Sequence, residues 1–168
     1  MLLITAGNAA PGDPGDACSG FTWNVARELA LFAGAPQAGT AGAAQDSAPA
    51  LANERLYELA LAPQEQVHFL VAPSKKPRAG NTYGGLAKIR VTADGLYRVS
   101  LDQPYWVDVV ADGKVVPSKD FQARPGCTAP HKVVEFALSS SQDLLLQFSN
   151  AVAPRVRVTI TPAAPPKP

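Results

Sequence analysis

The sequence carries little charge and almost no surplus of one sign. Charged residues make up 17% of its 168 residues, and 15 Lys and Arg against 14 Asp and Glu leave a net charge of +1. A nucleic-acid-binding domain normally has a basic surplus, and a membrane-surface protein a polybasic patch, so the balance argues against both partners. The chain also lacks a run of about 18 or more apolar residues, so no transmembrane segment is expected.

Motifs that mark common enzyme classes are missing as well. There is no Gly-x-Ser-x-Gly elbow, phosphate-binding loop, dinucleotide fingerprint or His-Glu-x-x-His. The only two histidines, His68 and His131, lack the spacing of metal ligands, so we expect ordinary surface or hydrogen-bonded roles for both. The serines at 139–141 have no neighbouring histidine and are typical of a turn. We therefore expect no catalytic activity, cofactor or metal.

The chain has only two cysteines, Cys18 and Cys127. Residues 1–17 are apolar at first and then small, as in the second half of a secretory signal, although the basic start is missing; the alternative is a flexible apolar segment. An even number of cysteines in an exported chain favours a disulfide, and the alternative is two unrelated thiols. These features predict a periplasmic or secreted protein.

Glycine and proline are abundant, with 13 and 16 residues, which suits short strands and turns better than a helical bundle. One helix is expected over residues 21–33, where large apolar residues recur at helical spacing and Thr22 or Asn24 can cap the start. A helix this apolar needs a partner surface. The segment 34–53, rich in Ala, Gly, Pro and Ser, has no clear period and is predicted to be a loop.

Nine short strands are expected after residue 54. They cover residues 55–61, 67–71, 85–91, 96–101, 105–111, 114–116, 131–138, 143–149 and 155–161. The pairs Asp94-Gly95 and Asp112-Gly113 favour hairpin turns and an antiparallel meander. We predict a mainly β fold, an antiparallel two-sheet β-sandwich that is jelly-roll-like, with a closed barrel as the alternative. It would form a single domain over 18–161 with the helix packed on it, followed by a Pro-rich tail over 162–168.

Aromatic residues supply the candidate ligand-binding surface. Tyr83 lies in a Gly-rich segment expected to be a loop. Tyr105 and Trp106 are adjacent on one strand and face opposite sides, so one belongs to the core. A core position is the favoured alternative for Trp106, and the outward ring is a binding candidate only if it lies near Tyr83. The candidate ligand-binding residues, provided that a concave polar pocket collects them, are Tyr83, Arg90, Trp106 and Asp108.

Three aspartates, Asp102, Asp108 and Asp112, are the nearest approach to a calcium site in the sequence. Asp102 and Asp108 would approach each other across a hairpin, and carboxylate oxygens are the ligands that Ca²⁺ prefers. Asp112, however, is a turn former, and Asp102 ends a strand before Gln103. Ca²⁺ needs six or more oxygens, so these structural roles are the better interpretation.

The strand from Gly95 to Leu101 has a Gly-x-Tyr-x-Val cadence, and residues 55–161 thereby resemble the pre-peptidase C-terminal domains of secreted bacterial peptidases. The whole chain also resembles small exported proteobacterial proteins of unknown function. The matching residues are Cys18, Phe21-Thr-Trp23, Arg27-Glu28, Tyr83-Gly-Gly-Leu86, Gly95-Leu-Tyr97, Trp106-Val-Asp108, Cys127 and His131-Lys132. This second resemblance implies periplasmic residence and pairing of Cys18 with Cys127, and it implies no activity.

Three functions follow from these patterns. The first is an exported, non-catalytic β-sandwich that binds a protein or carbohydrate partner. The alternative is a structural or assembly protein of the envelope, a homo-oligomer that uses the apolar helix or an edge strand as its interface. The third is a hydrolase without a recognisable motif. None of them includes a nucleic-acid partner.

Overall fold

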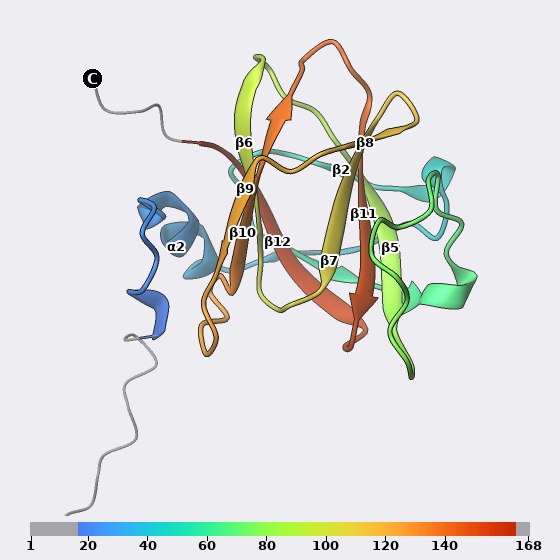
Figure 1. Cartoon of the computed structure of the whole chain (residues 1–168), viewed down its shortest axis with the longest axis horizontal. Helices are drawn as coiled ribbons and strands as arrows, with labels where there is room; N and C mark the ends of the chain where they lie inside the picture. Colours follow the sequence, from blue (N-terminus) through green and yellow to red (C-terminus); the bar gives the residue numbers. More distant parts are fainter. Residues whose placement is uncertain (1–16, 164–168) are drawn as a thin grey trace, which may run out of the picture.

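The computed structural model describes residues 17–163, which form two packed β-sheets with one helix against them (Figure 1). The strands are β1 (Gln37–Thr40), β2 (Ala50–Leu51), β3 (Tyr57–Ala60), β4 (Ala62–Pro63), β5 (Tyr83–Ile89), β6 (Gly95–Leu101), β7 (Trp106–Ala111), β8 (Lys114–Val116), β9 (Asp120–Ala123), β10 (Lys132–Leu138), β11 (Leu144–Ala151) and β12 (Arg155–Pro162). The predicted mainly β sandwich is confirmed.

The two sheets, here called sheet A and sheet B, are mixed. Sheet A has the order β1-β3-β12-β6-β10-β9, and sheet B has the order β2-β5-β11-β7-β8 with β4 beside β5. Most neighbours are antiparallel, but β1 pairs with β3 and β2 with β5 in parallel. The prediction of a purely antiparallel fold is wrong there. Both parallel strands come from the segment 34–53, which was predicted to be a loop because its side chains show no alternation.

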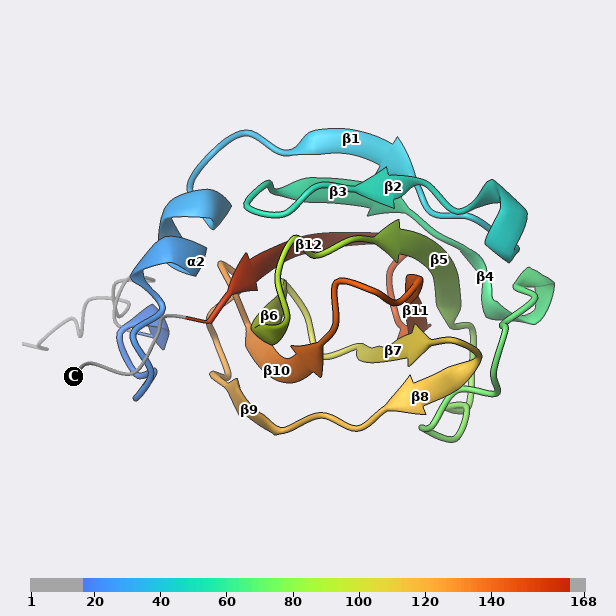
Figure 2. The same ribbon diagram turned by 90° about the horizontal axis from the view of Figure 1, so that it is seen from above.

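The main core consists of side chains from both sheets, whose arrangement is visible from above in Figure 2. The last strand illustrates how the sequence produces it. In β12, Val156, Val158 and Ile160 point inward and are at most 1% exposed, while the residues between them face outward. The strand β12 thus presents one apolar face to the core; it lies between β3 and β6 in sheet A, and Thr159 and Thr161 on its other face are buried as well.

Only one of the two predicted Asp-Gly hairpins forms. Asp112 and Gly113 have φ values of 49° and 76°, the left-handed pair that a tight hairpin between β7 and β8 requires. At Asp94-Gly95 the chain instead crosses from β5 in sheet B to β6 in sheet A. The Asp94 carboxylate accepts hydrogen bonds from Ser140 and Ser139, which ties this crossing to a neighbouring turn. The predicted meander is wrong at this point.

The helix α2 (Ala26–Phe32) is shorter than predicted and lies against sheet A. The N-cap residue is Val25, without a side-chain cap, so neither predicted cap, Thr22 or Asn24, is used; the Asn24 side chain accepts a hydrogen bond from the Ala26 N–H at 3.1 Å just before the helix. Val25, Glu28 and Phe32 face the sheet and are buried. Residues 21–25 are not helical, because the chain before Asn24 follows the sheet surface.

A disulfide joins Cys18 to Cys127, across 109 positions of sequence. It connects the segment before α2 to the loop before β10. The predicted pairing is confirmed. It holds the start of the described chain on the same side of sheet A as the helix.

Two end segments were predicted from the sequence. The apolar segment 1–17 lies outside the described residues except for residue 17, and so does most of the tail, residues 164–168. The start of the predicted tail is wrong, because β12 continues through Pro162 and the Ala163 N–H donates to Leu96 O at 2.9 Å. Within residues 17–163, no helix is long and apolar enough to cross a membrane.

Candidate functional site

Residues 67–82, here called the strap, cross the outer face of sheet B without joining it as a strand. The strand predicted over 67–71 is therefore wrong, and His68 is exposed on the strap rather than within a strand. The side chain of Gln147, in β11, forms hydrogen bonds with the backbone of the strap that a paired strand would otherwise form. Its Oε1 accepts from the N–H groups of Leu70 and Val71 at 2.9 and 3.2 Å, and its Nε2 donates to Val71 O at 2.9 Å.

Two further buried side chains hold the strap. Asn150 accepts from the Arg78 N–H at 3.1 Å and donates to Lys76 O at 2.9 Å. Asp108 accepts from the Ser74 N–H at 2.9 Å and from the Ser74 hydroxyl. Polar groups that are buried need such partners, so the three side chains and the strap stabilise one another.

Beside the strap, the outer face of sheet B is hollowed into a groove of about 630 Å³. Its floor is apolar and includes Leu70 of the strap, Val110 of β7 and Leu145 of β11. Leu70 is 44% exposed there. A concave apolar surface of this size is where a ligand is expected to bind.

Charges of opposite sign border this floor. Lys88 and Arg90 come from the end of β5, whereas Asp112 and Asp143 come from the β7–β8 turn and the start of β11. No Ser, Cys, His or aromatic residue is found among the described residues that line the groove. The groove can hold apolar groups and pair with charges, and its described lining has no hydroxyl, thiol or imidazole side chain.

The structure does not gather the four predicted ligand-binding residues into one pocket. Arg90 lines the groove. Trp106 and Asp108 lie together elsewhere on the outer face of sheet B, where the indole Nε1 donates to Asp108 Oδ1 at 3.0 Å. Tyr83 is half-buried and packs against the inner core instead. Both oxygens of Asp108 accept hydrogen bonds from within the protein.

The Gly-rich segment around Tyr83 is a strand rather than the predicted loop. A Cβ at Gly84 would lie 2.6 Å from Phe148 O, and one at Gly85 would lie 2.5 Å from the Ala41 Cβ. The glycines therefore allow neighbouring chains to approach β5 closely. The glycine-rich composition predicted a loop here. In the structure, the glycines are needed because a side chain at either position would collide with a neighbouring chain segment.

The adjacent rings of Tyr105 and Trp106 face opposite sides, as predicted. Tyr105 is 3% exposed in the inner core and donates its hydroxyl proton to Arg157 O at 2.9 Å. Trp106 is half-buried on the outer face, so the core alternative for this residue is wrong. Its Nε1 also lies 2.8 Å from the hydroxyl oxygen of Ser74.

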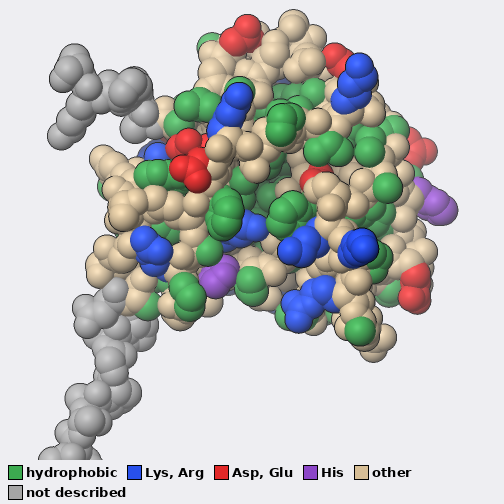
Figure 3. Space-filling view, in the orientation of Figure 1, with side chains coloured by type: hydrophobic (Ala, Val, Ile, Leu, Met, Phe, Trp, Pro, Cys, Tyr) green, Lys and Arg blue, Asp and Glu red, His purple; other side chains and the backbone are tan. Residues whose placement is uncertain are grey.

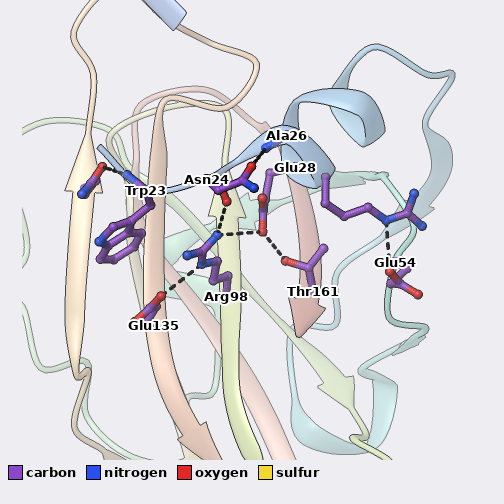
Figure 4. Close-up of polar contacts among 10 residues, drawn as sticks. Trp23, Asn24, Ala26, Glu28, Glu54, Arg98, Glu135 and Thr161 are labelled. Atoms are coloured by element: carbon purple, nitrogen blue, oxygen red, sulfur yellow. Dashed lines mark hydrogen bonds and ion pairs between the residues drawn. The ribbon is translucent and has the colours of Figure 1, made fainter. Parts of the chain in front are cut away.

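A buried ion network under α2 was not predicted (Figure 4). The Arg98 guanidinium lies 3.6 Å from Glu28 Oε1 and donates to Glu135 Oε1 at 3.1 Å and to Asn24 O at 2.8 Å. Glu28 Oε1 also accepts from the Thr161 hydroxyl at 2.7 Å, while its Oε2 is buried without a hydrogen-bond partner. The network fixes the helix on sheet A.

The signal for Glu28 was present in the sequence. Val25, Glu28 and Phe32 share one face of the helix at spacings of three and four residues. A carboxylate on the face that packs against the sheet needs a cation beneath it. Only the tertiary arrangement shows that this cation is Arg98.

The aspartates considered for calcium do not meet. Asp102 ends β6 in sheet A, and Asp108 lies in β7 of sheet B. Asp102 Oδ1 accepts from the Arg157 N–H at 2.9 Å. His131 is similarly engaged, with Nδ1 3.1 Å from Cys127 O. Across residues 17–163, no group of three or more His, Cys, Asp or Glu side chains is placed to hold a metal ion.

Comparisons with known proteins add no assignment. No family model matches the chain, and no curated protein matches it. Among solved structures, the chain is similar to part of a β-glucosidase from Kluyveromyces marxianus in complex with glucose, at 14% identity and a TM-score of 0.33. That likeness covers 59% of this chain and 12% of the enzyme, and it carries no functional argument.

Proposed function

We propose that the protein is an exported, non-catalytic binding module that holds a segment of a partner protein in the groove on sheet B. The observation that carries this proposal is the groove itself, with its apolar floor of Leu70, Val110 and Leu145. Its basic border at Lys88 and Arg90 lies across from acidic residues, so a bound peptide is oriented by complementary charges.

A protein segment suits this groove better than a neutral glycan. The apolar face of a sugar packs well on a flat aromatic ring, and the described lining has none. Aliphatic side chains such as Leu70 instead accommodate the aliphatic side chains of a peptide. Main-chain groups of such a peptide can bond with the amides of Gln45 and Gln142 at the border.

Export is supported by the Cys18–Cys127 disulfide, because structural disulfides form and persist in oxidising compartments. The proposed location is the periplasm or the extracellular space. The described groove lining has no hydroxyl, thiol or imidazole side chain, and we propose that its Lys and Asp side chains pair with charges of the ligand. A panel of esterase, glycosidase and peptidase substrates is accordingly expected to show no turnover.

Assembly into a homo-oligomer through the helix is the competing account. Val25 and Phe32, which would supply an apolar interface, are 4% and 5% exposed because they pack against sheet A. We therefore expect a monomer in static light scattering. A stable dimer would favour the assembly account instead.

The direct test is selection of peptides from a displayed library on the oxidised protein, followed by fluorescence anisotropy with labelled peptides. Leu70→Ser removes an apolar contact of the groove, and binding is expected to weaken about tenfold. Leu96→Ser is the matched control, since Leu96 is 45% exposed, compared with 44% for Leu70, and lies in sheet A. Equal effects of the two substitutions, or no selectable peptide, would contradict the proposal.

A further inference from the structure

Two lysines and two aromatic rings alternate in a row where the two sheets meet, away from the groove. Lys75 Nζ lies 5.2 Å from the centre of the Trp106 ring, and Lys132 Nζ lies 4.8 Å from the same centre. Lys132 Nζ is also 5.5 Å from the centre of the Phe121 ring. We call these four residues the basic-aromatic row.

The row combines distant parts of the chain. Lys75 comes from the strap, Trp106 from β7 in sheet B, and Lys132 and Phe121 from β10 and β9 in sheet A. β9 and the strap lie on the face that Figures 1 and 3 present, and Figure 3 shows Lys and Arg side chains interspersed with hydrophobic ones on this face. Acidic side chains lie mostly near its outline.

The two lysine charges of the row outnumber the carboxylate charge of Asp108, which bonds to the Trp106 Nε1. Neither Lys75 nor Lys132 forms an ion pair with any residue in 17–163. Burial, together with the nearby charge of Lys75, lowers the pKa of Lys132 below its ordinary 10.5. The Asp108 carboxylate at the Trp106 N–H already accepts hydrogen bonds from Ser74 and Trp106. An anion placed between the lysines would relieve this repulsion.

The rings differ in what they can offer a ligand. Trp106 is held in place, because its Nε1 lies within 3.0 Å of both the Ser74 hydroxyl and the Asp108 carboxylate. Phe121 is 59% exposed, and one side of it borders the Lys132 ammonium. A flat apolar surface directly beside a cation matches a sugar ring that carries an acidic group.

We propose that the basic-aromatic row binds an acidic polysaccharide, with a sugar ring on Phe121 and carboxylates on Lys75 and Lys132. A single-stranded nucleic acid fits less well, because stacking of successive bases needs several exposed rings. The disulfide also supports an oxidising compartment, where nucleic acid is a less common partner. This inference is independent of the groove, since neither lysine nor either ring lines it.

The test uses polygalacturonate as the probe in isothermal titration calorimetry at low ionic strength. Fully methyl-esterified polygalacturonate keeps the sugar and removes the charge, while poly-glutamate keeps the charge and removes the sugar. Of the three polymers, we expect only polygalacturonate to bind. Its affinity should fall as NaCl is added, because salt screens the attraction. Equal binding of poly-glutamate or of an oligothymidylate would overturn the proposal, as would no binding of polygalacturonate.

Variants locate the site. Lys75→Gln and Lys132→Gln keep much of each side chain and remove its charge, and each is expected to weaken binding about tenfold. Phe121→Ser should also weaken it, whereas Val152→Ser, at a residue 58% exposed, should not. Lys114→Gln is the charge control, because Lys114 is exposed on β8 and contacts neither ring. Binding that is unchanged in Lys75→Gln and Lys132→Gln would overturn the proposal, and circular dichroism verifies the fold of each variant.

Discussion

The indole Nε1 of Trp106 donates a hydrogen bond to Oδ1 of Asp108 at 3.0 Å, between alternate residues of β7. Alternate residues of a strand share a face, so both side chains lie on the outer face of sheet B. Ser74 of the strap bonds to both. This contact joins the strap to the sheet and holds Trp106 of the basic-aromatic row in place.

Replacing Asp108 should therefore loosen the strap. Asp108→Ala leaves the Ser74 N–H without its acceptor and removes one of the two acceptors of the Trp106 Nε1–H, and we expect the unfolding free energy to fall by about 2–4 kcal/mol. Urea unfolding followed by tryptophan fluorescence measures the change. Asp46→Ala, at an exposed site, should stay within about 0.5 kcal/mol of the wild type. A similarly small effect of Asp108→Ala would show that the strap does not depend on this contact.

Removal of the disulfide should lower stability without abolishing the sandwich. The bridge spans 109 positions, and chain entropy predicts a loss of about 4–5 kcal/mol in the double variant Cys18→Ser, Cys127→Ser. The strand signal in circular dichroism should persist, because the main core contains neither cysteine. Trp23 emission should shift to the red as its segment leaves the sheet. An unchanged melting temperature in reductant would contradict this prediction.

The ion network under α2 should be far more sensitive than a surface pair on the same helix. Arg98→Ala leaves two carboxylates with side-chain exposures of 2% and 15% without their cation, and we expect a loss of about 3–5 kcal/mol. Arg27→Ala removes an ion pair of 3.0 Å whose side chains are 55% and 49% exposed, and it should cost less than about 1 kcal/mol. Thermal melts of the two variants provide the comparison. Similar losses would mean that the network does not fix the helix.

The pH dependence of stability should distinguish two aspartates. Burial raises the pKa of Asp102 above its ordinary 3.8, despite the Arg157 N–H that bonds to it. The folded state thus holds the Asp102 proton more tightly than the unfolded state, and ionisation of Asp102 reduces stability as pH rises. The stability of Asp102→Asn relative to the wild type should accordingly increase from about pH 3 toward neutrality and then level off.

Asp94 gives the opposite expectation and serves as the control. Hydrogen bonds from the backbone and hydroxyl of Ser140, and from the Ser139 hydroxyl, lower the pKa of this exposed carboxyl. Its contribution to stability is present above the unfolded-state pKa and is lost as pH falls through the folded-state pKa. Asp94→Asn should therefore lose stability relative to the wild type as pH rises. Parallel profiles for the two variants would contradict both assignments.

Elements with a local signal could be predicted from the sequence. The alternation in 155–161 and the left-handed pair Asp112-Gly113 both depend on residues that are adjacent in the chain. The strands β1 and β2 have no such signal, since they are short edge strands that depend on pairing with β3 and β5. The strand β9 was also missed, and it pairs only with β10.

The candidate site was harder to predict because distant contacts build it. The residues 67–71 have the composition of a strand, yet they pair with the Gln147 side chain, which lies 76 and 77 positions away from Val71 and Leu70. Asp108 and Trp106 were predicted to bind a ligand together. They are in contact, but Asp108 accepts hydrogen bonds from Ser74 of the strap. Of the four predicted ligand-binding residues, only Arg90 lines the groove. The position of the groove depends on the path of the strap, because the strap covers the neighbouring part of sheet B.

Amide NMR spectra of the labelled protein, recorded during titration with a peptide selected on it, test the central claim most directly. Because the groove is the proposed binding site, shifts should concentrate at Leu70, Lys88 and Arg90, and the amides of α2 should not move. Shifts centred on α2, or scattered over both sheets without a maximum at the groove, would contradict the proposed function.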